Sequence, residues 1–431
     1  MNQSINLTLN PHYFKTFKFF ILAFIGLFFC GCYVIQTGGI ISNRWDNETI
    51  IAVHLFTLGF LLPIFLGAIT QLLPVLFGIE NNLLKIFDLL IYIFPFTTAV
   101  FLYSFHHYSL INNYFLLSAL MLFWFSLIYL AKEILQRILI KYREQKKIMY
   151  VHFIISLVYL TLGLMASIWL ILVHFGFNLP VFRPHATNVH LILFILGFFY
   201  HLFIAISQHI IPMFFITQPV PEKILKHQLV MPFLVLLLIL SNHVTIISLL
   251  TKLLVGYLFS EYILQLFICF KKRRRKSKDP SIRFWYLFFS NCLLSLLLWI
   301  FMSLTDNLSE IRELQLGGII FLGVFLNLIL AMLIKIIPFL IWQNLSQKQM
   351  EQMNFQITLP TLSDLIPRSD IVNLFYLAIL VTVLSVTKFY TALGFCLIAV
   401  SLYLGYLLIN ALKIHQNVLI QLNENQKTLN A

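Results

Sequence analysis

Apolar stretches of membrane-spanning length, separated by short polar segments, alternate along nearly the whole chain. A helix rises about 1.5 Å per residue, so ~20 apolar residues cross the ~30 Å hydrocarbon core of a bilayer. We therefore predict an all-α polytopic membrane protein in which residues 1–431 form a single membrane domain. The twelve predicted spans cover residues 14–41, 49–78, 86–105, 114–131, 149–175, 187–215, 229–248, 253–270, 284–304, 315–342, 371–387 and 390–412.

The composition agrees with this fold class and excludes others. Hydrophobic residues make up 60% of the chain and charged residues 10%, whereas soluble domains average roughly 45–50% and about 25%. A water-soluble globule cannot cover so much apolar surface, and a disordered chain requires the opposite composition. The five cysteines lie in or at the ends of apolar runs and lack the spacing of a disulfide framework or a zinc site.

Lys and Arg residues are distributed unevenly between alternate loops. If the N-terminus is inside, most of the 29 Lys and Arg residues fall in inner segments, above all in residues 132–147 and 271–283. The positive-inside rule then predicts that both termini are cytoplasmic. The basic run from Lys271 to Lys278 is interpreted as a topology determinant that touches anionic lipid, rather than as a nucleic-acid site. The expected partner is the lipid bilayer, with no nucleic acid.

Three of the predicted helices share the same spacing of small residues and proline. Segments 55–77, 193–215 and 319–341 align without gaps. Each has a glycine, a small residue eight positions later and a proline fifteen positions later: Gly59, Gly67, Pro74; Gly197, Ala205, Pro212; and Gly323, Ala331, Pro338. Small residues let helices approach closely in lipid, and proline can end or kink a helix. Because each segment is the second helix of four, we predict three pseudo-repeats, approximately residues 1–140, 141–270 and 271–431.

Three four-helix blocks are also the layout of the catalytic subunit (subunit I) of heme–copper oxidases and nitric oxide reductases, which this sequence resembles. Residues 54–60, HLFTLGF, are similar to that subunit's second helix, where a histidine at the outer end ligates the low-spin heme. The motifs QLLPVLFG (71–78), IIPMFFITQPVP (210–221) and KIIPFLIW (335–342) are similar to those of uncharacterised bacterial inner-membrane proteins and, more distantly, of the NnrS family. The resemblance implies a multi-pass protein of the bacterial inner membrane that binds heme or copper and associates with other membrane subunits.

The ligand set of an oxidase is incomplete in this sequence. The sixth predicted helix lacks a His-Pro-Glu motif, and the seventh has Asn242-His243 in place of a His-His pair. The tenth predicted helix, which holds ligands of both hemes in the oxidases, contains no histidine. We therefore predict that the chain does not reduce oxygen, and the sequence assigns no other enzymatic activity.

Seven of the 13 histidines lie near the predicted outer face: His54, His106, His107, His174, His185, His190 and His243. Imidazoles at one depth can ligate heme or copper, or they can bond to lipid headgroups and helix ends. We predict His54 and His190 as the leading ligands of a heme b or a copper ion, with His201 and His243 in support. The alignment pairs His54 with Ile192 rather than with His190, so the two leading histidines are out of register.

Further polar residues lie within the predicted spans. His190, Gly197, His201 and Gln208 are separated by seven, four and seven residues, which places them on one face of an ideal helix. Three polar residues occupy aligned positions near the cytoplasmic side: Gln71, His209 and Lys335. They either form a polar path or extend their polar ends to the membrane interface, and we favour the second interpretation for Lys335. Glu261 lies deep in the eighth predicted helix, either as a proton-relay carboxyl or, as we favour, as a protonated and hydrogen-bonded one.

Three functions agree with these features. We predict a membrane protein that resembles the oxidase subunit and binds heme or a metal through its outer-side histidines. The first alternative is a cofactor-free structural or assembly subunit of a respiratory complex, favoured by the missing histidines of the tenth helix. The second is a transporter of a small solute or metal that uses the histidine stripe, although transporters more often contain two repeats with broken helices.

Overall fold

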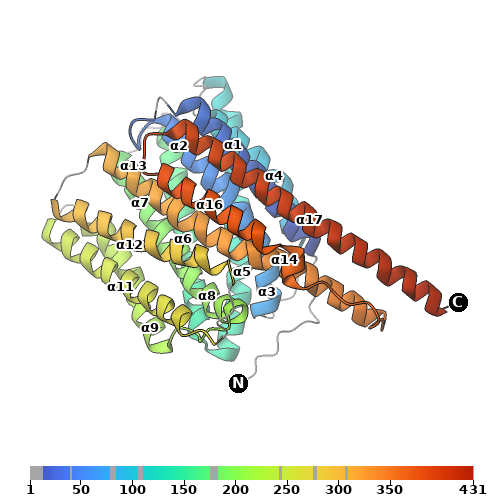
Figure 1. Cartoon of the computed structure of the whole chain (residues 1–431). Coiled ribbons are helices and arrows are strands. Elements are labelled where there is room, and N and C mark those ends of the chain that lie inside the picture. The colour runs from blue at the N-terminus through green and yellow to red at the C-terminus, as the bar shows by residue number, and fades with distance from the viewer. Residues whose placement is uncertain are drawn as a thin grey trace. The chain divides into compact units, whose positions relative to one another are not determined.

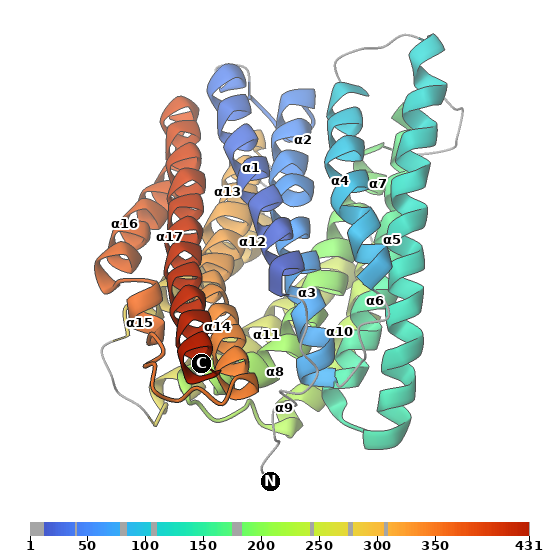
Figure 2. The same ribbon diagram turned by 90° about the vertical axis from the view of Figure 1, so that its right-hand side faces the viewer.

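The computed structural model describes residues 13–38, 41–77, 84–104, 110–174, 183–241, 245–274, 279–305 and 309–430. Every regular element in these ranges is a helix (Figures 1 and 2). Each predicted span overlaps at least one helix, and the described residues contain ten helices or helical series that are long and apolar enough to cross a membrane. The described residues thus confirm an all-helical protein of the multi-pass membrane type.

The contacts divide the chain into two units. Unit 1 comprises residues 1–10, 72–277 and 296–307, and unit 2 comprises residues 11–71, 278–295 and 308–431. Unit 1 contains α4 (Leu84–Ser104), α5 (Leu110–Gln145), α6 (Ile148–His174), α7 (Arg183–Ile192), η3 (Leu193–Phe199), α8 (Tyr200–Phe215), α9 (Glu222–His227), η4 (Gln228–Val230), α10 (Met231–Leu240) and α11 (Thr245–Lys271). Unit 2 contains α1 (Tyr13–Thr37), α2 (Asn47–His54), η1 (Leu55–Leu61), α13 (Glu310–Gly318), η6 (Ile319–Phe325), α14 (Leu326–Glu351), α15 (Leu362–Leu365), α16 (Arg368–Leu384) and α17 (Tyr390–Asn430). The helices α3 (Leu62–Phe77) and α12 (Ile282–Thr305) have residues in both units.

In unit 1, α6 packs against the series formed by α7, η3 and α8. The close approach depends on glycines on both sides, since a Cβ atom at Gly163 would lie 2.7 Å from the Phe194 ring and one at Gly197 would collide with Tyr159. On its other side α6 packs against α5, where the Trp124 indole N–H donates to Ser167 Oγ at 2.7 Å. These contacts make α6 the central helix of the part of unit 1 that carries the polar residues described below.

In unit 2, α1 lies alongside α17 over much of its length (Figures 1 and 2). The backbones meet where Gly31 faces Gly394, because a Cβ at either position would come within 2.7 Å of the other glycine's carbonyl oxygen. The same helix meets η1 at Gly26, where a Cβ would collide with the carbonyl group of Gly59. Close helix contact of this kind requires residues without a side chain.

Each of the three aligned helices contains a π-helical segment at the same seven alignment positions: η1, η3 and η6. A π turn closes its hydrogen bonds from i to i+5 and holds one residue more than an α turn, and such segments are frequent at functional sites. The aligned glycine is the fifth residue of each segment, and a Cβ added there meets Gly26, Tyr159 or Asn291. The close approach predicted at these glycines is therefore present in all three helices.

The aligned prolines lie inside helices rather than at their ends. Pro74, Pro212 and Pro338 are within α3, α8 and α14. The helix α8 ends three residues after its proline, at Phe215, and the next residue, Ile216, has a left-handed φ of 51°. The described part of α3 likewise reaches Phe77, three residues after Pro74. The helix α14 continues to Glu351, because residues such as Gln, Lys and Glu favour helix.

The helices α5 and α17 extend well beyond the predicted ends at 131 and 412, to Gln145 and Asn430. Another difference from the predicted boundaries lies between the seventh and eighth spans. We expected helices over 229–248 and 253–270, but α10 ends at Leu240 and α11 already begins at Thr245. The Thr251-Lys252 pair, expected in a loop, forms part of α11, where the Thr251 hydroxyl donates to the Ile247 carbonyl at 2.7 Å. A helix thus satisfies these polar groups internally.

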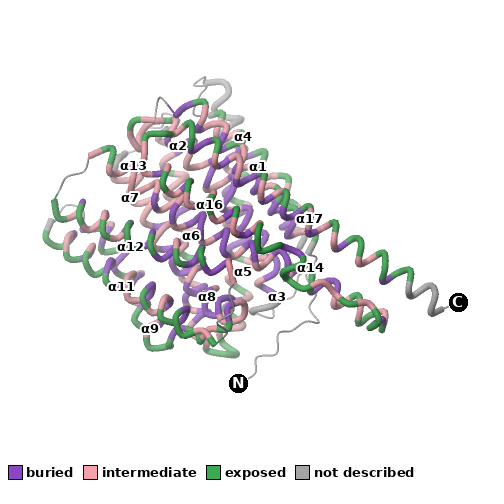
Figure 3. Tube along the Cα trace, in the orientation of Figure 1, coloured by how far each residue is buried: buried purple, intermediate pink, exposed green. Residues whose placement is uncertain are grey.

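Exposed and buried positions alternate around the helices (Figure 3). One side of α11 exposes Ile246, Leu250, Leu254, Tyr257 and Leu264, whereas Tyr262, Leu266 and Phe270 are buried. A helix whose exposed side is as apolar as its buried side does not face water. These surfaces are those of helices surrounded by lipid.

Candidate functional site

His54 is the last residue of α2 and directly precedes the π-helical segment η1. Its ring is half-buried, and Nδ1 lies 2.7 Å from the carbonyl oxygen of Ile50 one turn earlier. A carbonyl can only accept, so Nδ1 carries the proton and the lone pair of the neutral ring is on Nε2. Histidines that ligate metals usually donate their second N–H to a carbonyl or carboxylate in this way.

The other predicted ligands are less closely defined. His190 is in α7 of unit 1, and its ring packs on Phe194 with the centroids 4.9 Å apart. His54 belongs to unit 2, so the pairing of these two imidazoles stays a prediction. His243, His106 and His107 lie outside the residues that the structure describes.

The predicted stripe on the sixth helix is interrupted by η3. This segment lies between His190 and His201, and its extra residue turns the helix by about 100° relative to an uninterrupted α-helix. Within η3, Gly197 faces Tyr159, and after it His201 faces His152; both partners are on α6. The fourth position, Gln208, donates instead to the Tyr262 hydroxyl of α11 at 3.3 Å. The lower half of the stripe is thus a packed interface with two neighbouring helices.

His201 forms a buried pair with His152, which we call the histidine dyad. Both side chains are 0% exposed, and their Nδ1 atoms are 2.9 Å apart. The rings are nearly parallel, with an interplanar angle of 18° and centroids 5.2 Å apart. The other nitrogen of His152, Nε2, lies 3.1 Å from the carbonyl oxygen of Leu225 in α9.

These distances determine where the protons of the neutral dyad lie. The Leu225 carbonyl can only accept, so His152 carries its proton on Nε2 and presents a lone pair on Nδ1. His201 must then donate from Nδ1, which leaves the lone pair of His201 on Nε2. That nitrogen is buried and has no hydrogen-bond partner among the described residues. The dyad therefore ends in a free acceptor inside unit 1.

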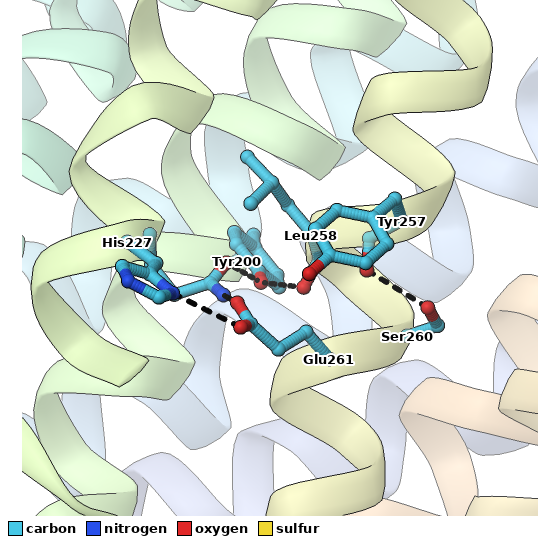
Figure 4. Close-up of polar contacts among 7 residues, drawn as sticks. Tyr200, His227, Tyr257, Leu258, Ser260 and Glu261 are labelled. Carbon is cyan, nitrogen blue, oxygen red and sulfur yellow. Dashed lines mark hydrogen bonds and ion pairs between the residues drawn. The ribbon is translucent and has the colours of Figure 1, made fainter. Parts of the chain in front are cut away.

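A second polar cluster joins α8, η4 and α11 (Figure 4). Both carboxylate oxygens of Glu261 accept hydrogen bonds, Oε1 from His227 Nδ1 and Oε2 from Gln228 Nε2, each at 3.0 Å. The Gln228 carbonyl in turn accepts from the Tyr200 hydroxyl at 2.6 Å. The Glu261 side chain is 15% exposed and that of His227 46% exposed, so the cluster extends from the interior of unit 1 to its surface.

The remaining residues of the predicted polar path have separate partners. In unit 2, Lys335 Nζ lies 2.6 Å from Asp279 Oδ2 and forms a partly buried ion pair. Burial raises the pKa of Asp279, but the charge and hydrogen bond of Lys335 outweigh this effect and hold the pKa below its usual value. Gln71 donates to the Thr16 hydroxyl at 2.7 Å, also in unit 2, and His209 is half-buried in α8.

The sequence analysis missed His152, Tyr200, His227 and Gln228. His152 could have been noticed, because an ionisable residue one turn into an apolar span is costly and usually has a partner. The other three carried no such signal. His227 and Gln228 lie in a predicted loop and at the edge of a span, and Tyr200 is one of 18 tyrosines.

No group of three or more His, Cys, Asp or Glu side chains that could hold a metal ion occurs among the residues that the structure describes. The sequence matches no family model and no curated protein.

Proposed function

We propose that this chain is a heme-binding membrane protein of the type of the oxidase catalytic subunit, in which His54 would hold the heme, and that it lacks oxygen reductase activity. The proposal includes twelve spans in three four-helix blocks, cytoplasmic termini and a location in the bacterial inner membrane. The observation that supports it most is the hydrogen bond from His54 to Ile50, which leaves Nε2 as the ligating nitrogen. The adjoining π-helical segment adds to this support.

The donor chemistry of His54 fits heme better than it fits a bare metal ion. A metal ion needs three or four protein ligands, and the described residues contain no such group. A porphyrin brings four nitrogen donors, so it needs only one or two imidazoles from the protein. A half-buried ring can also accept a large planar group more readily than His201, whose Nε2 is enclosed by packed side chains.

A bound heme would supply one-electron redox chemistry or the binding of a diatomic gas. The protein residues would hold the ring and set its orientation: His54 through Nε2, and the Ile50 carbonyl by fixing the plane and tautomer of the imidazole. Of the other predicted ligands, His190 and His243 stay candidates for holding a heme or copper, whereas His201 is engaged by His152. The alternative within this proposal is that the same histidines bind a copper ion instead of heme.

The test is an absorption spectrum of the purified protein, oxidised and dithionite-reduced, together with a pyridine hemochrome assay. We expect a Soret band and reduced α-band of a b-type heme in the wild-type protein. His54→Ala should abolish or shift the Soret band, and imidazole added to His54→Gly should restore it. Val53→Ala, a neighbouring half-buried position on α2, is the matched control and should keep the wild-type spectrum.

A wild-type protein that is colourless and metal-free when purified from heme-replete membranes would refute the proposal. That result would favour the cofactor-free subunit of a respiratory complex. Metal without heme in elemental analysis would instead favour the copper variant or transport of a metal.

A further inference from the structure

The histidine dyad has the geometry of a proton relay. We propose that His152 and His201 pass protons between the interior of unit 1 and the α9 segment, by transfer through two imidazole rings. This inference is independent of heme binding, because the two rings belong to unit 1 and His54 to unit 2. It rests on two hydrogen-bond distances, 2.9 and 3.1 Å, and on the buried Nε2 of His201.

Each step conserves protons and charge. An incoming proton binds the lone pair on His201 Nε2, which makes that ring an imidazolium. The proton on His201 Nδ1 then moves 2.9 Å to His152 Nδ1. The proton on His152 Nε2, which points to the Leu225 carbonyl, is finally released to water at α9. One proton has entered, one has left, and both rings are neutral again.

The passage leaves both rings in the opposite tautomer, and the Leu225 carbonyl then drives the return. His152 Nε2 would present a lone pair to the carbonyl oxygen, and two acceptors 3.1 Å apart repel each other. A proton returning in the opposite direction reprotonates His152 Nε2 and restores the hydrogen bond. The tautomer in the structure is thus the resting state, and the relay works in both directions.

One end of the relay lies on α9, where Leu225 is buried but nearby residues in the sequence are exposed. The helix α9 that carries Leu225 also carries Glu222 and Lys226, which form an exposed ion pair, and His227, which is 46% exposed. On the other side the Tyr200 ring packs on His201, with the centroids 5.6 Å apart. Glu261 of α11 contacts His227 and Gln228 rather than either ring of the dyad. The Glu261 cluster is therefore separate from the dyad, although both reach α9.

An alternative explanation is that the dyad only joins α6, α8 and α9. Two neutral hydrogen bonds contribute about 1 kcal/mol each to stability. A purely structural role, however, does not require groups that exchange protons, and an amide side chain would serve as well. This difference decides between the two roles, because His152→Gln presents a carbonyl to His201 and an N–H to Leu225 but does not relay a proton.

The experiment measures exchange of the ring N–H protons with water in histidine-labelled ¹⁵N protein in lipid nanodiscs. In the wild type we expect the His201 Nδ1–H to exchange at least about tenfold faster than the backbone amide of Ala205, which is buried in the same helix and exchanges only when the helix opens. A coupling across the hydrogen bond between the two Nδ1 atoms identifies the dyad in the spectrum. This comparison needs no variant, so it holds even if a substitution prevents folding.

The variants then separate relay from packing. His152→Gln should slow exchange of the His201 ring proton by about tenfold or more, towards the Ala205 rate, with the unfolding temperature little changed. Tyr200→Phe removes a neighbouring hydroxyl but leaves the dyad, so exchange should stay at the wild-type rate. Wild-type exchange as slow as that of Ala205 would overturn the proposal, as would an unchanged rate in a folded His152→Gln protein.

Discussion

The contact between α1 and η1 yields a quantitative prediction about Gly26. A Cβ atom at this position would collide with the carbonyl group of Gly59 and lie 2.8 Å from its Cα atom. The obstacle is backbone, so a rotamer change cannot relieve it and the two helices must separate. Overpacking of this kind in a well-packed core lowers the free energy of unfolding by about 1–3 kcal/mol. Alanine regains about 0.5–1 kcal/mol from its higher helix propensity.

We therefore expect Gly26→Ala to lower the free energy of unfolding by about 1 kcal/mol, and by at most about 2.5 kcal/mol, after both effects are included. Gly405→Ala in α17 is the matched control, since no atom lies within 4 Å of the Cβ that it adds. This variant should be neutral or stabilising by up to about 1 kcal/mol. Gly59→Ala should lie between the two, because its Cβ would be 3.3 Å from Gly26 Cα.

The free energy of unfolding can be measured by reversible titration with sodium dodecyl sulfate in mixed micelles, followed by tryptophan fluorescence. The order of stability should be Gly405→Ala above Gly59→Ala above Gly26→Ala. If Gly26→Ala is as stable as Gly405→Ala, then α1 and η1 do not approach as closely as the structure has them, and the reasoning is refuted.

Two further predictions concern groups at the ends of the spans. Asp279→Asn should destabilise unit 2 by about 1–3 kcal/mol at pH 7, because it removes the charged partner of the partly buried Lys335 ammonium. The pKa of Asp279 is lower in the folded than in the unfolded protein, so the ion pair stabilises the fold above the unfolded pKa of ~4. This stabilisation is lost as the pH falls through the folded pKa. The unfolding temperatures of variant and wild type should therefore converge in acid and not in base. In a cysteine-free background, Ser42→Cys should react with a membrane-impermeant maleimide in intact cells, whereas Ser363→Cys should react only after permeabilisation; the reverse pattern would contradict cytoplasmic termini.

The sequence predicted the spans well because hydrophobicity alone determines them. Each predicted span overlaps a helix, and the spaced glycines correctly indicated places of close approach. The partner of each glycine could not be predicted. Gly59 meets Gly26 of the first helix, but Gly197 meets Tyr159, a large side chain with no recognisable motif. In lipid the pattern that marks a contact surface does not encode its partner.

The polar residues were harder to place, because their roles depend on pairing between distant segments. His201 was selected from an ideal helical periodicity, but its partner His152 lies 49 positions earlier and was overlooked. Glu261 was recognised as unusual within a span, yet its hydrogen bonds come from a segment that was expected to be a loop. The assignment of Lys335 to the lipid interface likewise did not include Asp279, which lies 56 positions earlier in the chain.

The π-helical segments lead to a last prediction, about single-residue deletions in the sixth predicted helix. Removing Ile195 from η3 takes away the one extra residue, so a regular α-helix can form while both flanking parts keep their orientation. Removing Phe203 from α8 instead rotates the following turns by about 100° and withdraws Ser207 and Gln208 from the Tyr262 hydroxyl. Both deleted residues are half-buried and apolar, so the lost burial is similar. We expect the Ile195 deletion to yield folded protein with a modestly lowered unfolding temperature, and the Phe203 deletion to yield little protein by fluorescence-detected size exclusion. Equal yields of the two deletion variants would show that the extra residue is not confined to η3. The π-helical segments η1, η3 and η6 would then no longer support the proposed repeat.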